Sequence, residues 1–407
     1  MADNGYDVIV VGARCAGAPT AMLLARKVHN VLLVDRATFP SDTISTHVMH
    51  PPGVAALKRW GLLDDLVATG CPPIDTYSFD FGPFTIAGSP GTPDNALSYC
   101  PRRTVLDKLL VDAAAAAGAE VREGFTVEDI VREDGKVTGI RGHSKDGATV
   151  AEHARVVVGA DGRHSTVAEA VKPEQYNEKP DILCGYYSYW SGLDTQGRFE
   201  TYIRDRRGWA AAPTNDGLTL LVGGWPISEL NANKSDVEGN YLKMFEQDPP
   251  FAERLRAAKQ EARVVGTHVP NYFRKPYGDG WALVGDAAYN KDFITAQGIS
   301  DAFTGAEQVA NALDESLSGA RPLNEAMGEV QSARDNHVMP LYEFTYMLAS
   351  LEPPPPEMQQ VLGAVAQSQE AMDGFCRVSA GVTSPAEFFS EENIGRIFAG
   401  AGAPPGT

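Results

Sequence analysis

The first thirty residues alternate apolar and polar segments in an order that predicts strand, turn, helix and strand. Residues 8–11 are all apolar and β-branched, which is typical of a parallel strand buried on both faces. The turn GARCAG follows at residues 12–17, and residues 18–27 place Ala and Leu at helical spacing. Residues 30–34 predict a second buried strand that leads into Asp35. This order predicts the βαβ unit of a nucleotide-binding domain.

The glycine turn has the chemistry that a dinucleotide needs. Gly12 permits a tight turn, Gly17 allows close packing of helix and strand, and the helix N-terminus attracts a pyrophosphate. Asp35 follows Gly17 by 18 residues, close to the spacing expected for an acid that accepts a ribose hydroxyl. Arg14 replaces the middle glycine of G-x-G-x-x-G, so its side chain must point away from the pyrophosphate. The alternative is a glycine turn without a ligand, and the complete βαβ context argues against it.

The next part of the chain continues the α/β pattern. Residues 54–63 predict an amphipathic helix with a glycine near its end, and a second helix is expected from Arg102 to Gly118. Asp134-Gly135 lies between two apolar-polar alternating runs and predicts a hairpin turn. Residues 154–160 are another buried strand.

The pattern then changes twice. Residues 181–270 alternate aromatic and polar positions, which favours antiparallel strands with one buried face and hence a second domain. Nucleotide-type sequence returns at residues 281–286, and long helices are expected at 298–317 and 324–347. The terminal residues, AGAGAPPGT at 399–407, are expected to be disordered.

Composition limits the possible partners and location. The 407 residues include 53 Asp and Glu against 35 Lys and Arg, which gives a net charge of −18. This charge argues against a nucleic-acid partner and against stable association with an anionic membrane. We see no apolar run of membrane-spanning length and no room for a signal peptide before the first strand, so we expect a cytoplasmic protein. The five cysteines show no CxxC or metal-ligand spacing, so free thiols and no metal site are expected. A monomer and a homodimer both remain open.

Three separated motifs point to one ligand. They are GARCAG at residues 12–17, VGADGRHS at 158–165 and LVGDAAYNKDFITAQGISDAF at 283–303, with Arg103 between the first two. In this order they resemble the flavoprotein monooxygenases of the para-hydroxybenzoate hydroxylase type. The resemblance covers Tyr6 to about residue 345 and also fits geranylgeranyl reductases and flavin halogenases, which share the fold. Fold is therefore better specified than reaction.

The resemblance implies an α/β fold with a Rossmann-like FAD-binding domain of the glutathione reductase type. A mostly antiparallel β substrate domain is expected to be inserted into it, and a helical region to follow at the C-terminus. The expected division is FAD-binding domain at 1–77, 101–175 and 273–345, substrate domain at 78–100 and 176–272, and C-terminal helical region at 346–407.

The same resemblance assigns cofactor contacts. Asp35 would bind the adenosine ribose of FAD, Arg103 the phosphate–ribityl region, and Asp286 of the Gly-Asp motif the ribityl chain. The loop at 295–298 would present N–H groups to the flavin. NADPH or NADH is expected as a transient co-substrate, and the chain does not indicate which. The predicted FAD-binding residues are Gly12, Ala13, Arg14, Ala16, Gly17, Asp35, Arg36, Thr46, Arg103, Val127, Asp161, Gly162, Gly285, Asp286, Ala296, Gln297, Gly298 and Ile299.

The implied activity is NAD(P)H-dependent monooxygenation, in which a flavin hydroperoxide formed from molecular oxygen hydroxylates or epoxidises an aromatic or polyketide-like small molecule. His47 is the candidate catalytic residue, because an imidazole can deprotonate a phenol; a structural hydrogen bond is the alternative. Aromatic side chains of the second domain would cover the flavin, unless they only pack the core. The candidates for substrate contact are Tyr187, Tyr189, Tyr202, Trp209 and Trp225.

Other reactions fit the same motifs. An FAD-dependent reductase or dehydrogenase acting on carbon–carbon double bonds would need them too, and a flavin-binding sensor without turnover is a third possibility. A flavin-dependent halogenase ranks lower, because the chain has no W-x-W-x-I-P stretch and no lysine in the expected setting. Asp292-Phe293 stands where family members commonly carry a proline. The segment at 292–298, called the flavin loop below, is therefore expected to differ in shape.

Overall fold

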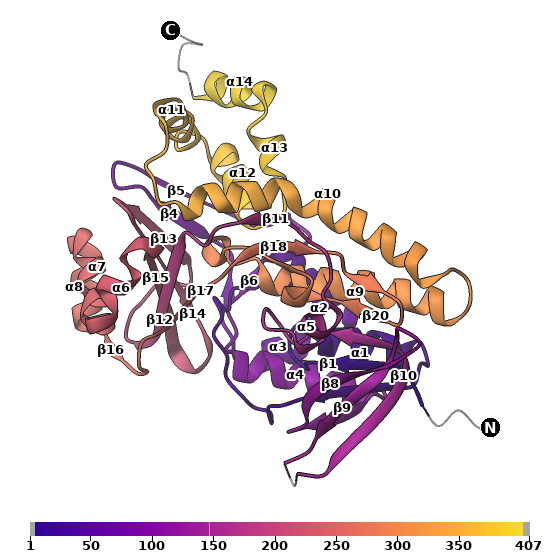
Figure 1. Ribbon diagram of the computed structural model, residues 1–407. Coiled ribbons are helices and arrows are strands. Elements are labelled where there is room, and N and C mark those ends of the chain that lie inside the picture. Colours follow the sequence, from indigo (N-terminus) through magenta and orange to yellow (C-terminus); the bar gives the residue numbers. More distant parts are fainter. Residues whose placement is uncertain (1–4, 146, 402–407) are drawn as a thin grey trace.

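The computed structural model describes residues 5–145 and 147–401 (Figure 1). Its first sheet has the order β19-β20-β10-β1-β2-β7, with β1 parallel to both β10 and β2. Strands β8 and β9 form an antiparallel extension that pairs with the first half of β10. The strands are β1 (Tyr6–Val11), β2 (Val31–Asp35), β7 (Glu120–Glu123), β8 (Thr126–Glu133), β9 (Lys136–His143), β10 (Thr149–Gly159), β19 (Tyr277–Gly278) and β20 (Trp281–Leu283).

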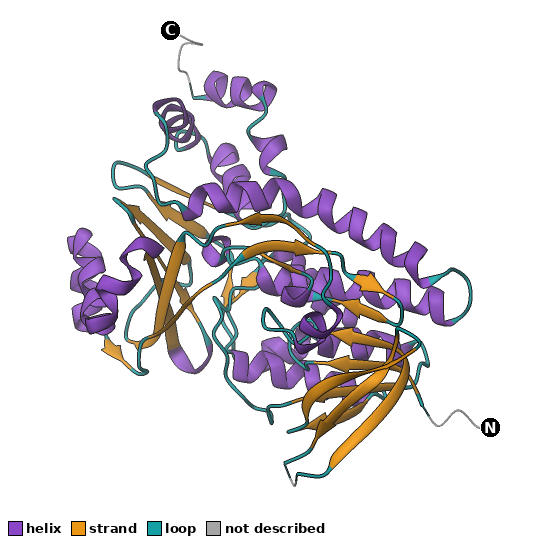
Figure 2. Ribbon diagram, viewed as in Figure 1, coloured by secondary structure: helices purple, strands orange, loops and turns teal. Residues whose placement is uncertain are grey.

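Helices and the β8–β9 extension cover opposite faces of this sheet (Figures 1 and 2). Val8 and Val10 of β1 pack with the helices, whereas Ile9 and Val11 pack beneath β8, β9 and α5, because successive strand residues point to opposite faces. Burial on both faces explains the unbroken apolar run of β1. The helices of this part are α1 (Gly17–Arg26), α2 (Pro51–Trp60), α3 (Leu63–Ala68), α4 (Arg103–Ala116), α5 (Thr166–Val171), α9 (Gly298–Leu317) and α10 (Leu323–Ala349).

The second large sheet has the order β16-β12-β15-β14-β13-β4-β5, with β17 also paired to β12. All its pairings are antiparallel except β13 with β4. Its strands are β4 (Tyr77–Asp80), β5 (Thr85–Gly88), β12 (Leu183–Ser191), β13 (Phe199–Arg204), β14 (Arg207–Pro213), β15 (Leu218–Pro226), β16 (Lys259–Gln260) and β17 (Val265–His268).

Both faces of the second sheet are buried. One face packs on the helices that follow β15, and the other faces the C-terminal helices and the first domain (Figure 1). The helices here are α6 (Leu230–Asn233), α7 (Val237–Met244), α8 (Pro249–Ala257), α11 (Pro356–Val365), α12 (Gln369–Ser379), α13 (Pro385–Phe388) and α14 (Glu391–Gly400). The small sheets comprise β11 (Gln175–Lys179), β18 (Asn271–Arg274) and β21 (Tyr289–Asn290), and β3 (Pro73–Ile74) with β6 (Ser98–Tyr99).

Short 3₁₀ turns connect several of these elements. Two of them, η5 and η6, follow β20 and β21 and belong to the Gly-Asp motif and to the loop before α9. The turns are η1 (Asn215–Gly217), η2 (Ile227–Glu229), η3 (Lys234–Asp236), η4 (Phe245–Gln247), η5 (Gly285–Ala287) and η6 (Phe293–Thr295).

The predicted fold class is confirmed: an α/β nucleotide-binding fold is combined with an antiparallel-rich second sheet and a helical C-terminus. Helix α9 has the predicted bounds, and the hairpin turn Asp134-Gly135 has positive φ at both residues, as a primed turn requires. Helix α2 begins three residues earlier than expected, because its first position accepts Pro51, and it ends at the left-handed Gly61.

Three further sequence expectations concern the C-terminal tail, membrane-spanning helices and the cysteines. Residues 399–400 of the expected disordered tail end helix α14, and residues 402–407 lie outside the described residues. Within the described ranges, no helix combines the length and apolar character needed to cross a lipid bilayer. The five cysteines are free and buried.

The glycine turn of the first sheet leaves no room for a side chain. Gly12 has φ +99°, and a Cβ added to Gly17 would lie 1.7 Å from the carbonyl oxygen of Gly12. The first turn of α1 therefore passes directly against the end of β1, which is the close approach that the sequence predicted for Gly17.

We predict that Gly17→Ala lowers the free energy of unfolding by about 1–3 kcal/mol or more, because backbone must move to admit the methyl group. Urea unfolding measures the change. Gly363→Ala in α11 is the matched control: its Cβ meets open space, so the variant should gain about 0.5–1 kcal/mol. Equal stability of the Gly17 variant and the wild type would contradict the packing argument.

Candidate functional site

A cavity of about 930 Å³ runs along the carboxyl ends of the parallel strands and continues to the second sheet. Gly12 follows β1, Asp35 ends β2, Asp161 follows β10 and Gly285 follows β20, so the four chain segments meet at one edge of the first sheet. Ligands of open α/β sheets bind at this edge. The tertiary structure thus brings the three separated sequence motifs into one wall.

Nearly all predicted FAD-binding residues line this cavity. The exceptions among them, all of which lie in the described ranges, are Ala13, Gly17 and Gln297. The Gln297 side chain instead donates to the carbonyl oxygen of Ser379 in α12 at 2.9 Å. Ala296 has φ +53° and lines the cavity with Gly298 and Ile299, which begin α9.

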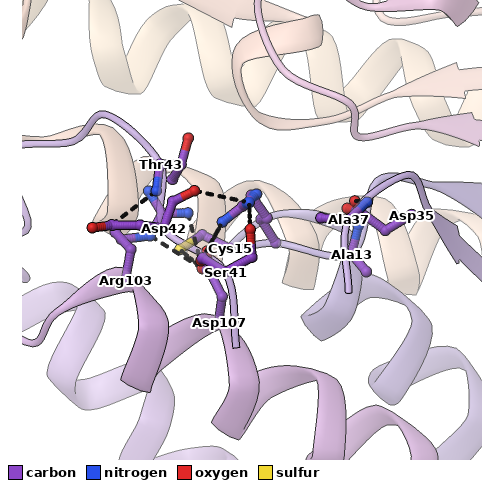
Figure 3. Close-up of polar contacts among 10 residues, drawn as sticks. Ala13, Cys15, Asp35, Ala37, Ser41, Asp42, Thr43, Arg103 and Asp107 are labelled. Atoms are coloured by element: carbon purple, nitrogen blue, oxygen red, sulfur yellow. Dashed lines mark hydrogen bonds and ion pairs between the residues drawn. The ribbon is translucent and has the colours of Figure 1, made fainter. Parts of the chain in front are cut away.

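Asp35 is held at the end of β2 by two backbone N–H groups (Figure 3). The N–H of Ala13 donates to Asp35 Oδ2 and the N–H of Ala37 donates to Asp35 Oδ1, both at 2.7 Å. The carboxylate is buried with 8% exposure and ties the glycine turn to β2. Each oxygen keeps a lone pair, so the group can still accept a ribose hydroxyl.

Asp107 of α4 joins two arginines beside the glycine turn (Figure 3). This fully buried carboxylate accepts from Nε and Nη2 of Arg103 at 3.1 and 2.9 Å and from Nη1 of Arg14. The thiol of Cys15 also donates to Asp107 Oδ1 at 3.4 Å. Two guanidinium groups against one carboxylate give this cluster a net positive charge beside the glycine turn, which fits an anionic pyrophosphate.

Arg14 also fastens the loop after β2. Its guanidinium donates to the carbonyl oxygen and the hydroxyl of Ser41 at 3.2 and 3.1 Å, so it bridges the glycine turn, that loop and α4. Asp107 was not predicted to be a site residue from the sequence. The available signal was its position four residues after Arg103 on a helix, where opposite charges meet on one face.

The Asp-Gly and Gly-Asp motifs follow the neighbouring strands β10 and β20, so they lie side by side in the cavity wall. Asp161 Oδ2 accepts from the Thr166 N–H at 2.7 Å, whereas its Oδ1 has no hydrogen-bond partner in the described part of the chain. Gly285 has φ +62°, and a Cβ there would lie 2.7 Å from the Ala16 Cβ. The unpartnered Oδ1 of Asp161 and the lack of room for a side chain at Gly285 both fit a site that holds a bound group.

Asp286 lines the cavity, and it is exposed in the structure, which contains no ligand. The surrounding protein raises the pKa of Asp286 to about 6 by desolvation, and the positive charge of Arg103 partly opposes this. The carboxyl therefore retains acceptor capacity for a hydroxyl group inside the cavity, as the predicted ribityl contact requires.

His47 lies behind the cavity wall. It is fully buried with φ +61°, and Thr46 and Tyr187 are among the described residues that line the cavity whereas His47 is not. Its Nδ1 is 2.7 Å from the Ser45 carbonyl oxygen, which can only accept, so Nδ1 carries the hydrogen. Its Nε2 then accepts from the Tyr189 hydroxyl at 2.7 Å.

The electrostatic setting of His47 favours the neutral imidazole. Burial lowers the pKa of His47 to about 3, and the positive charges of Arg103 and Arg102 act in the same direction. Any effect of His47 on a ligand must pass through the tyrosines in front of it. Its catalytic role stays a prediction.

The predicted substrate aromatics are divided between the two faces of the second sheet. Tyr187 lines the cavity, and Tyr189 lies on the same face against His47. Tyr202 stacks on Trp209 at 5.3 Å, and Trp225 stacks on Tyr186 at 4.6 Å, in the cluster beneath α7 and α8. The structure therefore does not bring Tyr202, Trp209 and Trp225 to the cavity.

Several cavity residues were not identified as site residues from the sequence. Gly185 and Val222 of the second sheet and Asp292 and Phe293 of the flavin loop belong to the same wall. The one available signal was the departure Asp292-Phe293 from the usual proline, which indicated a changed loop but no function.

We predict that Asp286→Ala and Arg103→Ala each yield protein depleted of FAD, because each removes a polar group from the cavity wall that the cofactor would contact. The flavin-to-protein absorbance ratio of purified protein measures this. Asp112→Ala is the control, since Asp112 pairs with Lys108 on the exposed side of the same helix as Arg103. Normal flavin content in both site variants would mean that the cofactor is placed wrongly.

Comparison with known proteins agrees with this geometry. The family described as FAD binding domain matches residues 5–326. Digeranylgeranylglycerophospholipid reductase 2 of Methanothermobacter thermautotrophicus is 30% identical over 332 residues, 78% of this chain and 80% of the relative. The 6-methylpretetramide 4-monooxygenase of Streptomyces rimosus is 28% identical over 361 residues, 82% of this chain and 81% of the relative.

Among solved structures, the myxobacterial chondrochloren halogenase CndH aligns with a TM-score of 0.80 at 22% identity, covering 97% of this chain and 96% of that chain. This likeness shows the fold. The relatives include a reductase and a monooxygenase, so the comparisons leave the specific reaction open, whereas the resemblance drawn from the motifs is confirmed. Because the family match spans more than half of the chain, this protein belongs to the FAD binding domain family of FAD-dependent oxidoreductases.

Proposed function

We propose that this protein is an FAD-dependent, NAD(P)H-consuming monooxygenase that hydroxylates or epoxidises an aromatic or polyketide-like small molecule. The observation that carries the proposal is the single cavity that joins the nucleotide-binding edge of the first sheet to the aromatic face of the second. A relative named for the monooxygenation of 6-methylpretetramide supports it. The cytoplasmic location stays a prediction.

The residues of the first sheet would hold the cofactor. Asp35 and Arg103 suit the adenosine ribose and the phosphates, and Asp286 suits the ribityl chain. The N-terminus of α9 opens on the cavity through Gly298 and Ile299, and its partial positive charge favours an anionic reduced ring. When bound, FAD supplies the redox chemistry, accepting a hydride from the nicotinamide nucleotide and passing electrons to molecular oxygen.

The second sheet would place the substrate and exclude water. Tyr187 and Val222 supply the sheet side of the wall, and Phe293 of the flavin loop packs so closely on β12 that a Cβ on Gly185 would lie 2.3 Å from its ring. This contact joins the two domains beside the expected ring position. A closed apolar wall is what productive oxygen transfer requires, because access of water favours release of the reduced oxygen as hydrogen peroxide before it reaches the substrate.

Two tyrosines stand between the cavity and His47. Tyr187 lines the cavity, its ring meets the Tyr189 ring edge-on at 5.8 Å, and the Tyr189 hydroxyl donates to His47 Nε2. Since His47 Nδ1 is fixed as a donor to Ser45, Nε2 can only accept, and the imidazole therefore orients the Tyr189 hydroxyl. In this proposal His47 positions Tyr189, which packs on Tyr187, and the Tyr187 hydroxyl contacts a phenolic substrate.

The second candidate is an FAD-dependent reductase or dehydrogenase acting on carbon–carbon double bonds. Its support is the 30% identity to a digeranylgeranylglycerophospholipid reductase. This reaction would use the same cofactor contacts and would not incorporate oxygen. Halogenation is supported by fold alone.

Oxygen-18 incorporation tests the proposed reaction. The holoenzyme is supplied with NADH or NADPH, labelled oxygen gas and a panel of phenolic and polyketide ligands, and products are analysed by mass spectrometry. We expect a ligand that accelerates nicotinamide oxidation and gains one labelled oxygen atom. If every ligand gives only hydrogen peroxide and no labelled product, and an alkene is saturated, the reductase is favoured instead.

We predict that Tyr187→Phe and His47→Asn keep FAD content but slow product formation by about tenfold or more, because the first removes a hydroxyl from the cavity wall and the second removes the group that orients Tyr189 beside it. Asn tolerates the positive φ of position 47. Tyr186→Phe on the opposite face of β12 is the matched control. Since the low pKa keeps His47 neutral, no rate change between mildly acidic and neutral pH should be traced to it. Unchanged turnover in the His47 variant would assign this residue a purely structural role.

A further inference from the structure

His50 connects the second sheet to the flavin loop through two hydrogen bonds. It is the N-cap residue of α2 and is buried with 1% exposure. Its Nδ1 lies 2.6 Å from the hydroxyl of Tyr77 in β4, and its Nε2 lies 3.0 Å from the carbonyl oxygen of Thr295. Ala296 is among the described residues that line the cavity, whereas His50 and Thr295 are not. His50 therefore holds the flavin loop from behind the cavity wall.

The carbonyl group fixes the direction of these hydrogen bonds. The Thr295 oxygen can only accept, so Nε2 of His50 carries the hydrogen and Nδ1 accepts from the Tyr77 hydroxyl. The Tyr77 oxygen then accepts from the Ser98 hydroxyl at 2.8 Å. Burial lowers the pKa of His50 to about 4, although the hydrogen bond to Thr295 opposes this, so the imidazole is neutral near pH 7. The side chain thus has one tautomer and one orientation.

The hydrogen bond acts on the peptide group that begins the turn into α9. The carbonyl of this group belongs to Thr295 and accepts from His50, and its N–H belongs to Ala296 and donates to the Phe293 carbonyl oxygen at 2.8 Å. Ala296 has φ +53°, a left-handed conformation that costs energy in a residue other than glycine and must be imposed by its surroundings. Both ends of the peptide group are therefore held, which fixes the turn.

The turn decides where the first N–H groups of α9 point. These groups have no acceptor within the helix and carry its partial positive charge. Gly298 and Ile299 of the first turn of α9 line the cavity beside Ala296. Helix α2 also packs closely on this turn, because a Cβ added to Gly53 would lie 2.9 Å from Ser300 Oγ. The start of α2 thus supports both the flavin loop and the start of α9.

We propose that His50 is a positioning residue for the flavin: it holds the Thr295 carbonyl so that the turn at Ala296 aims the N–H groups of α9 at the flavin ring. The inference rests on the proposed function, which places the ring beside the N-terminus of α9. Aimed N–H groups stabilise the anionic reduced ring more than the neutral oxidised ring, so they raise the reduction potential of the bound cofactor. His50 would therefore act on the flavin without touching it.

The reduction potential of the bound flavin tests this without substrate or oxygen. It is measured on the purified holoenzyme by equilibration with a reference dye under nitrogen. His50→Asn and His50→Gln form a matched pair, because both introduce an amide and differ only in its reach. The Asn amide reaches the place of Nδ1, near Tyr77, whereas the Gln amide reaches the place of Nε2 and can donate to Thr295.

We expect the two amide variants to differ. In the Asn variant the affinity for reduced flavin, relative to oxidised flavin, should fall about three- to tenfold, which lowers the two-electron potential by about 15–30 mV. The Gln variant should keep the wild-type potential. His50→Ser, which like Asn is a favoured N-cap residue and cannot reach Thr295, gives the same comparison if the Asn variant does not fold.

Tyr241→Phe is the control for the loss of a buried hydrogen bond to a carbonyl group. Tyr241 is fully buried in α7, and its hydroxyl donates to the Leu221 carbonyl oxygen at 2.7 Å, in the cluster beneath α7 and α8. This variant should keep the wild-type potential even where it unfolds at a lower temperature. A shift confined to the variants that lose the bond to Thr295 would separate positioning of the flavin from general stability.

Three results would overturn the proposal. They are an Asn or Ser variant with the wild-type potential, a Gln variant whose potential falls as far as that of the Asn variant, and a Tyr241 variant whose potential falls as far. Because no substrate or oxygen is involved, the outcome is independent of the oxygen-18 experiment. A lowered potential in the Asn variant, without oxygen incorporation by the wild type, would support the role of His50 and reject the monooxygenase.

Discussion

The arrangement of the site depends on one buried carboxylate. Asp107 binds Arg14 from the glycine turn and Arg103 from its own helix, and Arg14 in turn holds the Ser41 loop. Three segments far apart in sequence are therefore joined at the cavity wall by one group with no solvent exposure. Without the carboxylate, two guanidinium groups would be left close together, so the positive wall exists only because a negative charge lies behind it.

The second sheet is buried on both faces, so the residues on each face must pack against a different part of the molecule. The face toward α7 and α8 carries the stacked aromatic pairs and forms a core of its own. The opposite face supplies Tyr187 to the cavity and places Tyr189 against His47. Period-two alternation along β12 thus separates packing residues from candidate site residues, although all of them are aromatic.

The flavin loop connects the first domain to the second sheet. Phe293 closes the contact between loop and sheet, and Asp292 contributes a carboxyl oxygen that the fold leaves without a partner. A stable loop alone would favour a neutral residue here.

The sequence by itself determined the βαβ unit, the α9 helix and the family, because local periodicity and the three motifs are short-range properties. It also named most of the residues that line the nucleotide end of the cavity. Only the tertiary structure decided that Asp107 bridges two arginines, that His47 lies behind Tyr189, and that Trp209 and Trp225 face away. The physical reason is that an alternating aromatic strand indicates two faces without saying which is inward, and charge pairing across elements depends on distances that the chain order does not contain.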